Sequence, residues 1–422
     1  MEKIQENTEL FTADGVPLKL SLARAQRRSK IAAFMLVSPL LLFAIIFFIL
    51  PIADMLMLSA DNSIVERILP KTVESIKNWD PYSNELPEEA VFAAMVSDIK
   101  KAKKAREHTK IGTRLNYESS GFASLFRKAG RKVKKIKKPP YKEALIKTDK
   151  RWGDIYTWQV IKQNTSNYTD GYYLAAFDFK RKFNDGKVES LSEKDSIYLK
   201  LFLRTILLST LITFITFAIG FPVSYMLANV PTRISNILII FVLLPFWTSL
   251  LVRTTSWIAL LQQEGVINDF LLLIGVIGED GRLAMIHNAT GTVVAMTHIL
   301  LPFMILPLFS VMKTIPKSYV RAAISLGAHP WVAFWRIYFP NTGPGIGAGS
   351  ILVFIIAIGY YITPALVGGN SGTFISNRIA YHISNSLNWG LGSAIGVILL
   401  GIVLIFFFLY DKIVGINNMK LG

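Results

Sequence analysis

The stretch "RAAISLGAHPWVAFWRIYFP", Arg321 to Pro340, lies between two long apolar runs of a 422-residue chain. Pro316, just before it, suits the first turn of a helix. Gly327 is expected to end that helix in a left-handed conformation, and Pro330 to open a second short helix after the turn. Pro340 is expected to end the second helix, because proline cannot continue the hydrogen-bond ladder. The stretch therefore predicts two short helices joined by an elbow.

The two predicted helices differ in the surface that they present. Ala322 and Ala323 leave the first helix almost without side-chain bulk, so another protein could approach its backbone closely. Phe334, Ile337 and Tyr338 form an apolar stripe on the second helix, because residues three and four apart share a face. The alternative is an ordinary amphipathic connector that packs on its own helix bundle or lies at the membrane interface.

The apolar residues, 52% of the chain, are gathered in blocks, which is typical of a membrane protein. The first block, 31–53, has no charge and is long enough to cross ~30 Å of hydrocarbon at about 1.5 Å per residue. A cleavable signal peptide is the alternative, but the block is long for one and no A-x-A-like site follows. Five further runs lie at about 201–223, 237–260, 291–312, 345–367 and 391–410. We expect an all-α polytopic membrane protein with six transmembrane helices.

Lys and Arg in the short connecting segments predict the orientation, because such residues favour the cytoplasmic side. One set of segments carries most of them: Lys3, Lys19, Arg24, Arg27, Arg28, Lys30, Arg233, Lys313, Lys317, Arg321, Arg336, Lys412 and Lys420. The short segments of the opposite side carry only Arg282 and Arg378. The segment 1–30, the loop 314–342 and the tail 413–422 are therefore expected inside. The core that holds the remaining five helices would span 198–412.

The long insertion 54–197, between the first two helices, is then expected outside the cytoplasm. Residues 85–138 are rich in Ala and Lys and predict basic helices with few bulky apolar residues to fill a core. Residues 152–183 are aromatic-rich and contain "TDG", which indicates strands or a hairpin. The chain's net charge of +17 would suit nucleic acid, but this location argues against it. A solvated helical face, or one that touches anionic headgroups, remains the interpretation.

Several kinds of chemistry have no sequence support. There is no G-x-x-x-x-G-K-[ST] phosphate loop, no cysteine and no H-E-x-x-H spacing among the histidines. The Gly-rich "GPGIGAGS" at 343–350 follows no strand and opens an apolar helix, so it predicts close helix packing rather than a dinucleotide site. We expect no catalytic residue, no cofactor and no metal site in this chain.

The spacing within Arg321–Pro340 resembles the cytoplasmic "EAA" loop of ABC-transporter permeases of the binding-protein-dependent importer class. Ala322 and Ala323 are followed after three residues by Gly327, then after nine by Ile337, with Phe339 and Pro340 completing the pattern. Arg321 stands where the family has Glu, and Phe339 where it has Leu. The resemblance implies the type I importer permease fold and a loop that docks in a groove of an ATP-binding subunit. The docking set would be Arg321, Ala322, Ala323, Gly327, Phe334, Ile337, Phe339 and Pro340.

The same resemblance implies partners and a compartment. A second permease would complete the pathway, two ATP-binding subunits would bind the ATP, and an extracytoplasmic substrate-binding protein would deliver the substrate. The chain would then lie in a bacterial inner membrane with both termini in the cytoplasm. The competing interpretation is a membrane-anchored scaffold or receptor that uses the basic insertion.

From about Tyr198 onward, segments such as "LLPFWTSLLVRTTSWIALLQQEGVIND" and "GYYITPALVGG" are similar to the spermidine/putrescine type of permease. This resemblance implies a polyamine substrate, with another small organic solute as the alternative. No Asp or Glu lies within the six runs, so aromatic rings would have to line the path: Phe246, Trp247, Trp257, Tyr360 and Tyr361. The alternative for these rings is packing or an interface belt. Arg253 would repel a cation and is expected against the partner subunit or the outer surface.

Overall fold

A computed structural model describes residues 18–414 of the chain. Most of the expected cytoplasmic segment 1–30 and of the tail 413–422 lies outside the described residues. The chain divides into two units, 1–57 and 58–422, which are taken separately below.

The described part of the first unit is one long helix, apolar over most of its length. It comprises α1 (Leu18–Ala44), the π-helix η1 (Ile45–Ile49) and α2 (Leu50–Leu58). Residues Ser29–Leu58 are apolar and long enough to span a membrane, and none of the most apolar window is buried. The first predicted transmembrane helix is thereby confirmed.

The second unit contains three further continuous spans: α11 (Tyr198–Asn229), α15 (Ala289–Thr314) and α23 (Trp389–Val414). Two bent helix pairs accompany them. One joins α12 (Thr232–Trp247) at 95° to Leu250–Leu273, which holds α13 (Leu250–Leu261) and α14 (Val266–Leu273). The other joins Pro330–Asn341 at 58° to α19 (Gly343–Gly359). If each bent pair is one span, the described chain has six, as the sequence predicts.

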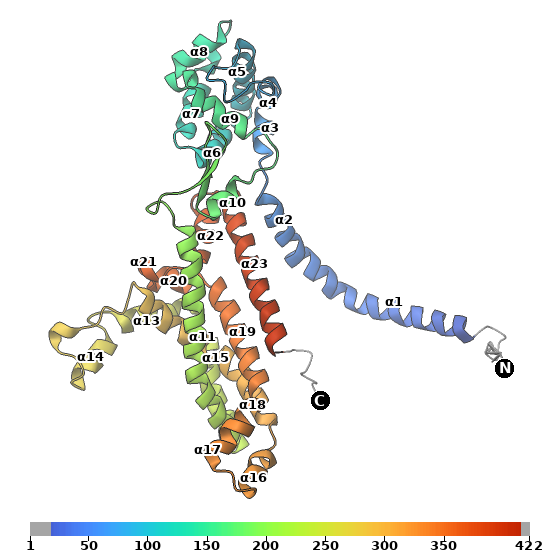
Figure 1. Cartoon of the computed structure of the whole chain (residues 1–422), viewed down its shortest axis with the longest axis vertical. Coiled ribbons are helices and arrows are strands. Elements are labelled where there is room, and N and C mark those ends of the chain that lie inside the picture. The colour runs from blue at the N-terminus through green and yellow to red at the C-terminus, as the bar shows by residue number, and fades with distance from the viewer. Residues whose placement is uncertain (1–17, 415–422) are drawn as a thin grey trace. The chain divides into compact units, whose positions relative to one another are not determined.

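The bundle core forms where α11, α15 and α19 pack together (Figure 1). Small residues permit this close approach: a Cβ on Gly220 of α11 would lie 3.0 Å from Met304 of α15. On α19, Gly345 and Gly349 face α15 in the same way, with Met304 also opposite Gly349. Small residues at helix interfaces compensate for the absence of a hydrophobic driving force in lipid. The predicted packing role of "GPGIGAGS" is confirmed.

Two of the predicted runs are not continuous helices, and on this point the sequence prediction is wrong. The run 237–260 breaks after Trp247, and the run 345–367 ends as a helix at Gly359 and resumes in α20 (Ile362–Val367) and α21 (Gly369–Gly372). The second break is stable because α22 (Ile375–Ser384) provides donors for the freed carbonyls. Ser376 Oγ donates to Tyr360 O at 2.7 Å, and Asn377 Nδ2 donates to Tyr361 O at 2.8 Å.

The insertion is a compact helical body with its own core. Its helices are α3 (Ile64–Ile68), α4 (Pro70–Ser75), α5 (Glu89–Lys104), α6 (His108–Glu118), α7 (Phe122–Lys132), η2 (Val133–Lys135), α8 (Tyr141–Thr148), η3 (Lys150–Gly153), α9 (Ile155–Gln163) and α10 (Gly171–Ala176). Phe92, Phe126, Trp152 and Trp158 are fully buried in it. The expectation of too few bulky residues for a core is wrong, because apolar side chains three and four residues apart gather on one face between the lysines.

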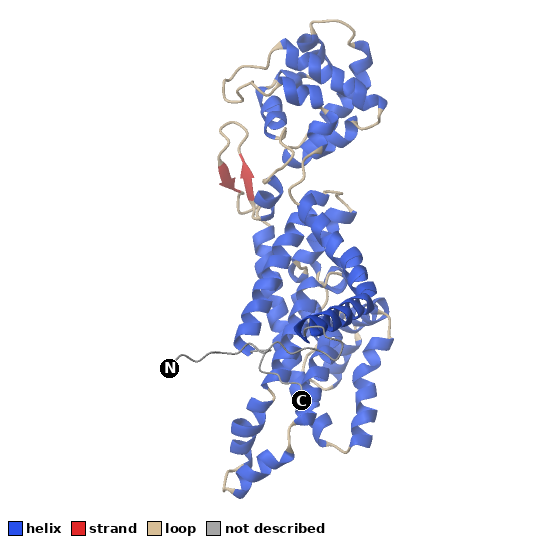
Figure 2. Ribbon diagram, turned by 90° about the vertical axis from the view of Figure 1, so that its right-hand side faces the viewer, coloured by secondary structure: helices blue, strands red, loops and turns tan. Residues whose placement is uncertain are grey.

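The strands predicted within 152–183 are mostly absent from the described chain. Most of that segment forms η3, α9 and α10, and Asp154 caps α9 by accepting from Tyr156 N at 3.0 Å. The aromatic content of this segment suggests strands, but the Asp154 cap and the buried face of α9 stabilise a helix instead. A short antiparallel hairpin follows, β1 (Phe179–Arg181) with β2 (Val188–Ser190), in the register Lys180↔Glu189 (Figure 2).

Polar and aromatic contacts join the insertion to one end of the bundle. Arg114 of α6 is buried and donates from Nε to Asn62 Oδ1 at 2.9 Å, and its guanidinium lies 4.7 Å from the ring centre of Tyr172. The Tyr172 ring in turn lies against Gly390 of α23. Tyr117 Oη donates to Ser386 O at 2.9 Å. The insertion is therefore attached to the bundle by packed side chains as well as by the chain itself.

Asp178, also buried, connects the insertion to the start of α11. Its carboxylate accepts from the backbone N–H groups of Ile197 and Tyr198, both at 3.0 Å, and of Leu199 at 2.8 Å. Ser196 Oγ donates to it at 2.9 Å. A carboxylate at a helix N-terminus satisfies orphan N–H groups and complements the helix dipole.

Candidate coupling surface and translocation pathway

The elbow predicted around Gly327 is present. Helix α16 (Lys317–Ser325) follows Pro316, and Gly327 has a φ of +90°, the left-handed region that favours glycine. Ala328 N donates to Ala323 O at 3.0 Å, which closes the helix end. Helix α17 (Pro330–Ala333) then begins at Pro330. The local geometry that the sequence predicts is confirmed.

The second helix does not end at Pro340, contrary to the prediction. α17 continues through the π-helix η5 (Phe334–Tyr338) into α18 (Phe339–Asn341), and the bend falls at Thr342. The Phe339 N–H bonds to Phe334 O, five residues back. This wider turn shifts the ladder just before proline, whose ring would otherwise meet a carbonyl four residues back. The π-helix η1 has the same relation to Pro51.

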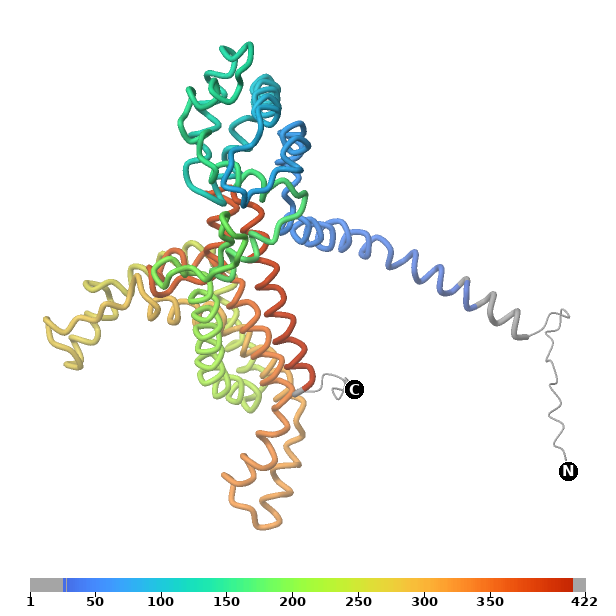
Figure 3. The backbone as a smooth tube through the Cα atoms, turned by 45° about the horizontal axis from the view of Figure 1, so that its top comes forward, coloured from blue at the N-terminus to red at the C-terminus, as the bar shows by residue number. Residues whose placement is uncertain are grey.

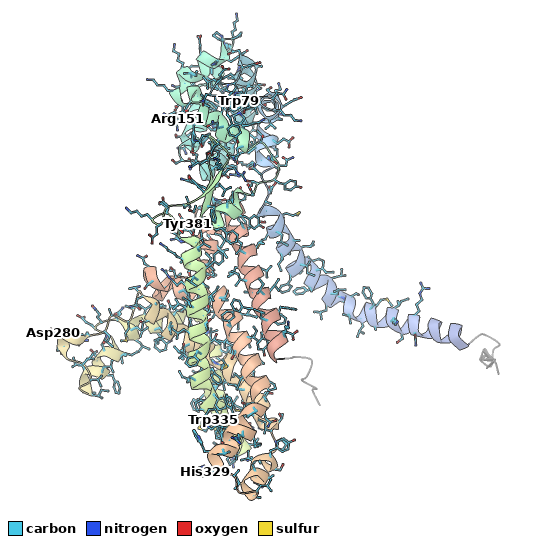
Figure 4. The ribbon with its side chains drawn as sticks, in the orientation of Figure 1. Trp79, Arg151, Asp280, His329, Trp335 and Tyr381 are labelled. Atoms are coloured by element: carbon cyan, nitrogen blue, oxygen red, sulfur yellow. The ribbon has the colours of Figure 1, made fainter. Side chains whose placement is uncertain are left out.

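The outer side of this elbow exposes large apolar side chains. Leu326 is 89% exposed and Trp331 65%, and Tyr319, Ile324, Val332 and Trp335 are exposed as well. Ala322 is exposed, Ala323 is half-buried, and a Cβ on Gly327 would meet nothing within 4 Å. His329 and Trp335 mark this end of the second unit, opposite Trp79 and Arg151 in the insertion (Figure 4). Large exposed apolar patches indicate interaction sites.

The inner side of the elbow packs on the bundle through aromatic rings. The ring of Phe334 lies edge-on to Tyr225 of α11, with centroids 5.7 Å apart. Phe339 lies 5.5 Å from Phe221, and the buried Tyr338 lies 5.2 Å from Tyr225. The predicted stripe of Phe334, Ile337 and Tyr338 therefore faces inward, with Ile337 half-buried.

Arg321, the position of the missing glutamate, is exposed on α16. Within the described chain no ion pair involves Arg321, so its charge is available to a partner. Pro340, the last residue of the predicted docking set, is exposed on α18.

The five candidate pathway rings fall into two groups. Trp247 is 71% exposed, Tyr361 47% and Phe246 39%, whereas Trp257 and Tyr360 are half-buried. Phe246 lies edge-on to Phe303 of α15 with centroids 5.0 Å apart. Tyr360 packs against the bundle core. The structure therefore gives packing partners to some of these rings and leaves others free to face a second subunit.

The side chain of Arg253 is half-buried, as are those of Trp257 and Tyr360. Its guanidinium lies near His298 and Tyr360, and its Nε is shielded from solvent with no hydrogen-bond partner in the described chain. Trp257 Nε1 donates to His298 Nδ1 at 3.2 Å. The sequence predicts that Arg253 faces a partner subunit or the outer surface. Its proximity to these groups depends on the sharp α12–α13 bend, which the sequence does not predict.

A bundle of proline-containing apolar helices, with an elbow projecting from one end, is the architecture of a multi-pass membrane protein. The family model "Binding-protein-dependent transport system inner membrane component" matches residues 205–414. The spermidine/putrescine transport system permease protein PotB of Salmonella typhimurium (strain SL1344) is 31% identical over 228 residues, covering 54% of this chain and 79% of that protein. PotB of Escherichia coli (strain K12) is 30% identical, covering 52% and 81%. This chain belongs to the family of binding-protein-dependent transport system inner membrane components.

One further relative is named for a different cargo. A probable sulfate transport system permease protein of Marchantia polymorpha is 33% identical over 89 residues, covering 21% of this chain and 31% of that protein. A solved bacterial ABC transporter that imports the acidic polysaccharide alginate has a TM-score of 0.45 and 16% identity, covering 53% of this chain and 80% of that chain. The insertion lies outside the residues that the family model matches.

Proposed function

We propose that this chain and a second permease form the pathway of an ATP-driven importer whose cargo is a polyamine of the spermidine/putrescine class. The observation that carries the proposal is the projecting elbow at Gly327, which exposes Leu326 and Trp331 at the end of the bundle opposite the insertion. A permease needs such a surface to receive motion from an ATPase that it lacks. The similarity to PotB supports the choice of cargo.

The orientation follows from the two ends of the second unit. We place the elbow in the cytoplasm and the insertion outside, in a bacterial inner membrane, with both chain termini in the cytoplasm. The lysines and arginines near the elbow support this placement. The partners are then two ATP-binding subunits below the elbow, a second permease beside the bundle, and a substrate-binding protein on the side of the insertion.

Coupling in this scheme is mechanical. ATP-driven closure of the ATPases would move the docked α16, and the contacts of Phe334 with Tyr225 and of Phe339 with Phe221 would pass the motion to α11. The cavity between the permeases would then switch between outward and inward access, as a rigid-body rearrangement of packed elements. The exposed Arg321 would require an acidic group, or no charge, at the facing position of the ATPase groove.

The faces of aromatic side chains along the pathway would stabilise the cation as it crosses the membrane. Each cation–π contact is worth about 0.5 to 2 kcal/mol, which lowers the barrier without trapping a polyamine. Trp247 and Tyr361 are exposed on the isolated permease and are our first candidates for this lining.

Arg253 favours a second candidate cargo. A half-buried guanidinium near His298 and Tyr360, with its Nε shielded from solvent, would attract an anionic group and repel a cation. If these residues line the path, the cargo would be another small organic solute that carries a carboxylate or phosphate. A membrane-anchored scaffold or receptor is the remaining alternative, and a P-loop ATPase that co-purifies with the chain would exclude it.

The experiment that tests the proposal is uptake by the complete complex in proteoliposomes. Labelled putrescine and spermidine are compared with a neutral and an anionic organic solute of similar size, each with its binding protein. We expect ATP-dependent uptake of the polyamines alone. Uptake of only the anionic solute would establish the second candidate, and no ATP-dependent uptake of any solute would reject the importer.

A further inference from the structure

The insertion carries a strongly basic face. It comprises Lys101, Lys103, Lys104 and Arg106 at the end of α5, together with Arg127, Lys128, Arg131, Lys132, Lys134, Lys135, Lys137 and Lys138 in α7, η2 and the segment after them. All of these side chains are exposed except Lys103, which is partly exposed. This set is called the basic face below.

Packing brings the two parts of the basic face together. Lys100 Nζ donates to Ile136 O, which joins α5 to the end of η2. His108, just after α5, lies so close to α7 that a Cβ on Gly130 would be 2.2 Å from its ring. The two segments that carry these cations therefore lie next to each other in one folded body.

Little of this charge is neutralised within the protein. In the described chain, Lys128 alone among the cations of the basic face forms an ion pair, with Asp149 Oδ2 at 3.1 Å. Asp149 is shared with Arg151, and Glu107 is occupied by Arg67 and Lys110. Like charges at this density repel one another, so they favour an external anionic partner.

Helices α5 and α7, which carry most of the basic face, lie farther from α11 and α23 than α10 does (Figure 1), and Figure 3 also shows the insertion beyond the ends of these two helices. The length of α6 gives the distance between the basic face and the bundle. This helix begins at His108, beside Gly130, and Tyr117 near its end contacts Ser386 of the bundle. The nine residue steps from His108 to Tyr117 span about 14 Å at about 1.5 Å each. That distance exceeds the Debye length of about 8 Å at physiological salt, so headgroups at the bundle end are largely screened from the face. A soluble partner is favoured over the protein's own membrane.

We propose that the basic face is a docking surface for the soluble substrate-binding protein, which would meet it with an acidic patch. The inference rests on the proposed function, since it requires the insertion to lie on the side where substrate arrives. The family is binding-protein-dependent, and the insertion lies outside the part that the family model matches. The basic face would repel a free polyamine, so it attracts the carrier rather than the cargo.

Docking at this face would also reach the bundle. The buried Arg114 contacts the Tyr172 ring, and that ring lies against Gly390 of α23.

Charges at the rim of an interface mainly accelerate association, and they make it dependent on salt. The expected signature is therefore a change in the concentration of binding protein required, with the maximal rate unchanged.

The test measures ATP hydrolysis by the full complex in nanodiscs as the binding protein that supports wild-type uptake is added. The variant R131E/K134E/K135E reverses the centre of the basic face. A matched control, K77E/K187E/K194E, makes the same change of net charge at exposed lysines elsewhere in the insertion. We expect the first variant to need about tenfold or more binding protein for half-maximal stimulation at low salt. Basal hydrolysis and the maximum should match those of the wild type, and the control should shift little.

Three outcomes would overturn the inference. An unshifted R131E/K134E/K135E, with normal wild-type stimulation and uptake, would reject the basic face while leaving the importer intact. An equal shift in both variants would show a net-charge effect without a docking face. A loss confined to binding of phosphatidylglycerol vesicles would assign the face to lipid. If the wild-type complex shows neither stimulation nor uptake, the proposed function fails and this inference fails with it.

Discussion

The ring of Tyr172 in the insertion lies directly against Gly390 at the start of α23, so that a Cβ on Gly390 would be 2.3 Å from two ring carbons. No side chain fits there without displacing the ring. The contact joins a part of the chain outside the family match to a helix within it.

Gly390→Ala should therefore destabilise the junction, by about 1 to 3 kcal/mol for overpacking of a tight contact. Gly401→Ala on the same helix is the matched control, because a Cβ there meets nothing within 4 Å. The control should be neutral or slightly stabilising, since alanine favours helix over glycine. Thermal unfolding in detergent compares the two, and equal midpoints would contradict the tight contact between Tyr172 and Gly390.

Asp178→Asn should loosen the first turn of α11. The substitution removes the negative charge that accepts from Ile197, Tyr198 and Leu199, which should cost about 1 to 2 kcal/mol. Amide hydrogen exchange in that turn is the measurement. Asp185→Asn in the hairpin loop provides the comparison, and unchanged exchange at Tyr198 would refute the cap.

Gly327→Val should abolish substrate-stimulated ATP hydrolysis, because a β-branched residue is strained at a φ of +90°. Gly327→Asn should retain it, since asparagine tolerates the left-handed region. Ala323→Asp should also abolish stimulation by adding bulk and charge to α16, while the permease remains folded. Full stimulation in Gly327→Val and Ala323→Asp would remove the coupling role from this loop.

His382 should make the protein less stable in mild acid. Burial, with a contribution from Arg378, lowers its pKa from 6.5 to about 4. The unfolded chain therefore binds a proton near pH 6.5 that the folded chain does not take up until about pH 4. Stability is lost as the pH falls through this window, by at most about 3 kcal/mol.

The measurement is the unfolding midpoint between pH 7 and pH 4. His382→Gln should flatten the profile, because no proton is then bound at this position in either state. His287→Asn, in an exposed loop, serves as the comparison. A wild-type profile that His382→Gln leaves unaltered would assign the acid sensitivity to other groups.

Tyr360→Ala combined with Tyr361→Ala should reduce polyamine uptake severalfold, because both rings lie at the break after α19. The control is Tyr82→Ala combined with Tyr168→Ala, which removes two exposed tyrosine rings from the insertion, outside the proposed lining. Normal uptake by the double variant would place both rings outside the path. Measuring stability alongside uptake separates lost packing at Tyr360 from lost conduction at the exposed Tyr361.

The continuous spans and the elbow could be predicted because local chemistry decides them. Charge-free apolar runs specify α11, α15 and α23, and a glycine between two short helices specifies the turn at Gly327. The broken spans could not be predicted. Pro222 and Pro302 lie inside continuous helices, whereas α12 ends two residues after Pro245, so proline alone does not mark a break. Tertiary partners such as Ser376 and Asn377 stabilise the second break.

The candidate site was predicted in part. Motif spacing located the outer face of the elbow, but it did not predict that Phe334 and Tyr338 pack inward on α11 or that a π-helix carries the chain past Pro340. In the insertion, average composition concealed the core: Phe92, Met95 and Ile99 share one face of α5 among lysines. Helical spacing was the signal that could have revealed it.

The Asp178 cap has a consequence for how this protein could have arisen and how it can be engineered. A permease core excised at Tyr198 would begin with two backbone N–H groups, those of Tyr198 and Leu199, that have lost their acceptor. The insertion is thus not a removable cassette, although it lies outside the family match. Grafting it onto another permease would require the recipient helix to accept the same carboxylate, and a gene fusion that ignores this would weaken the first turn of a helix at the centre of the transporter's own bundle.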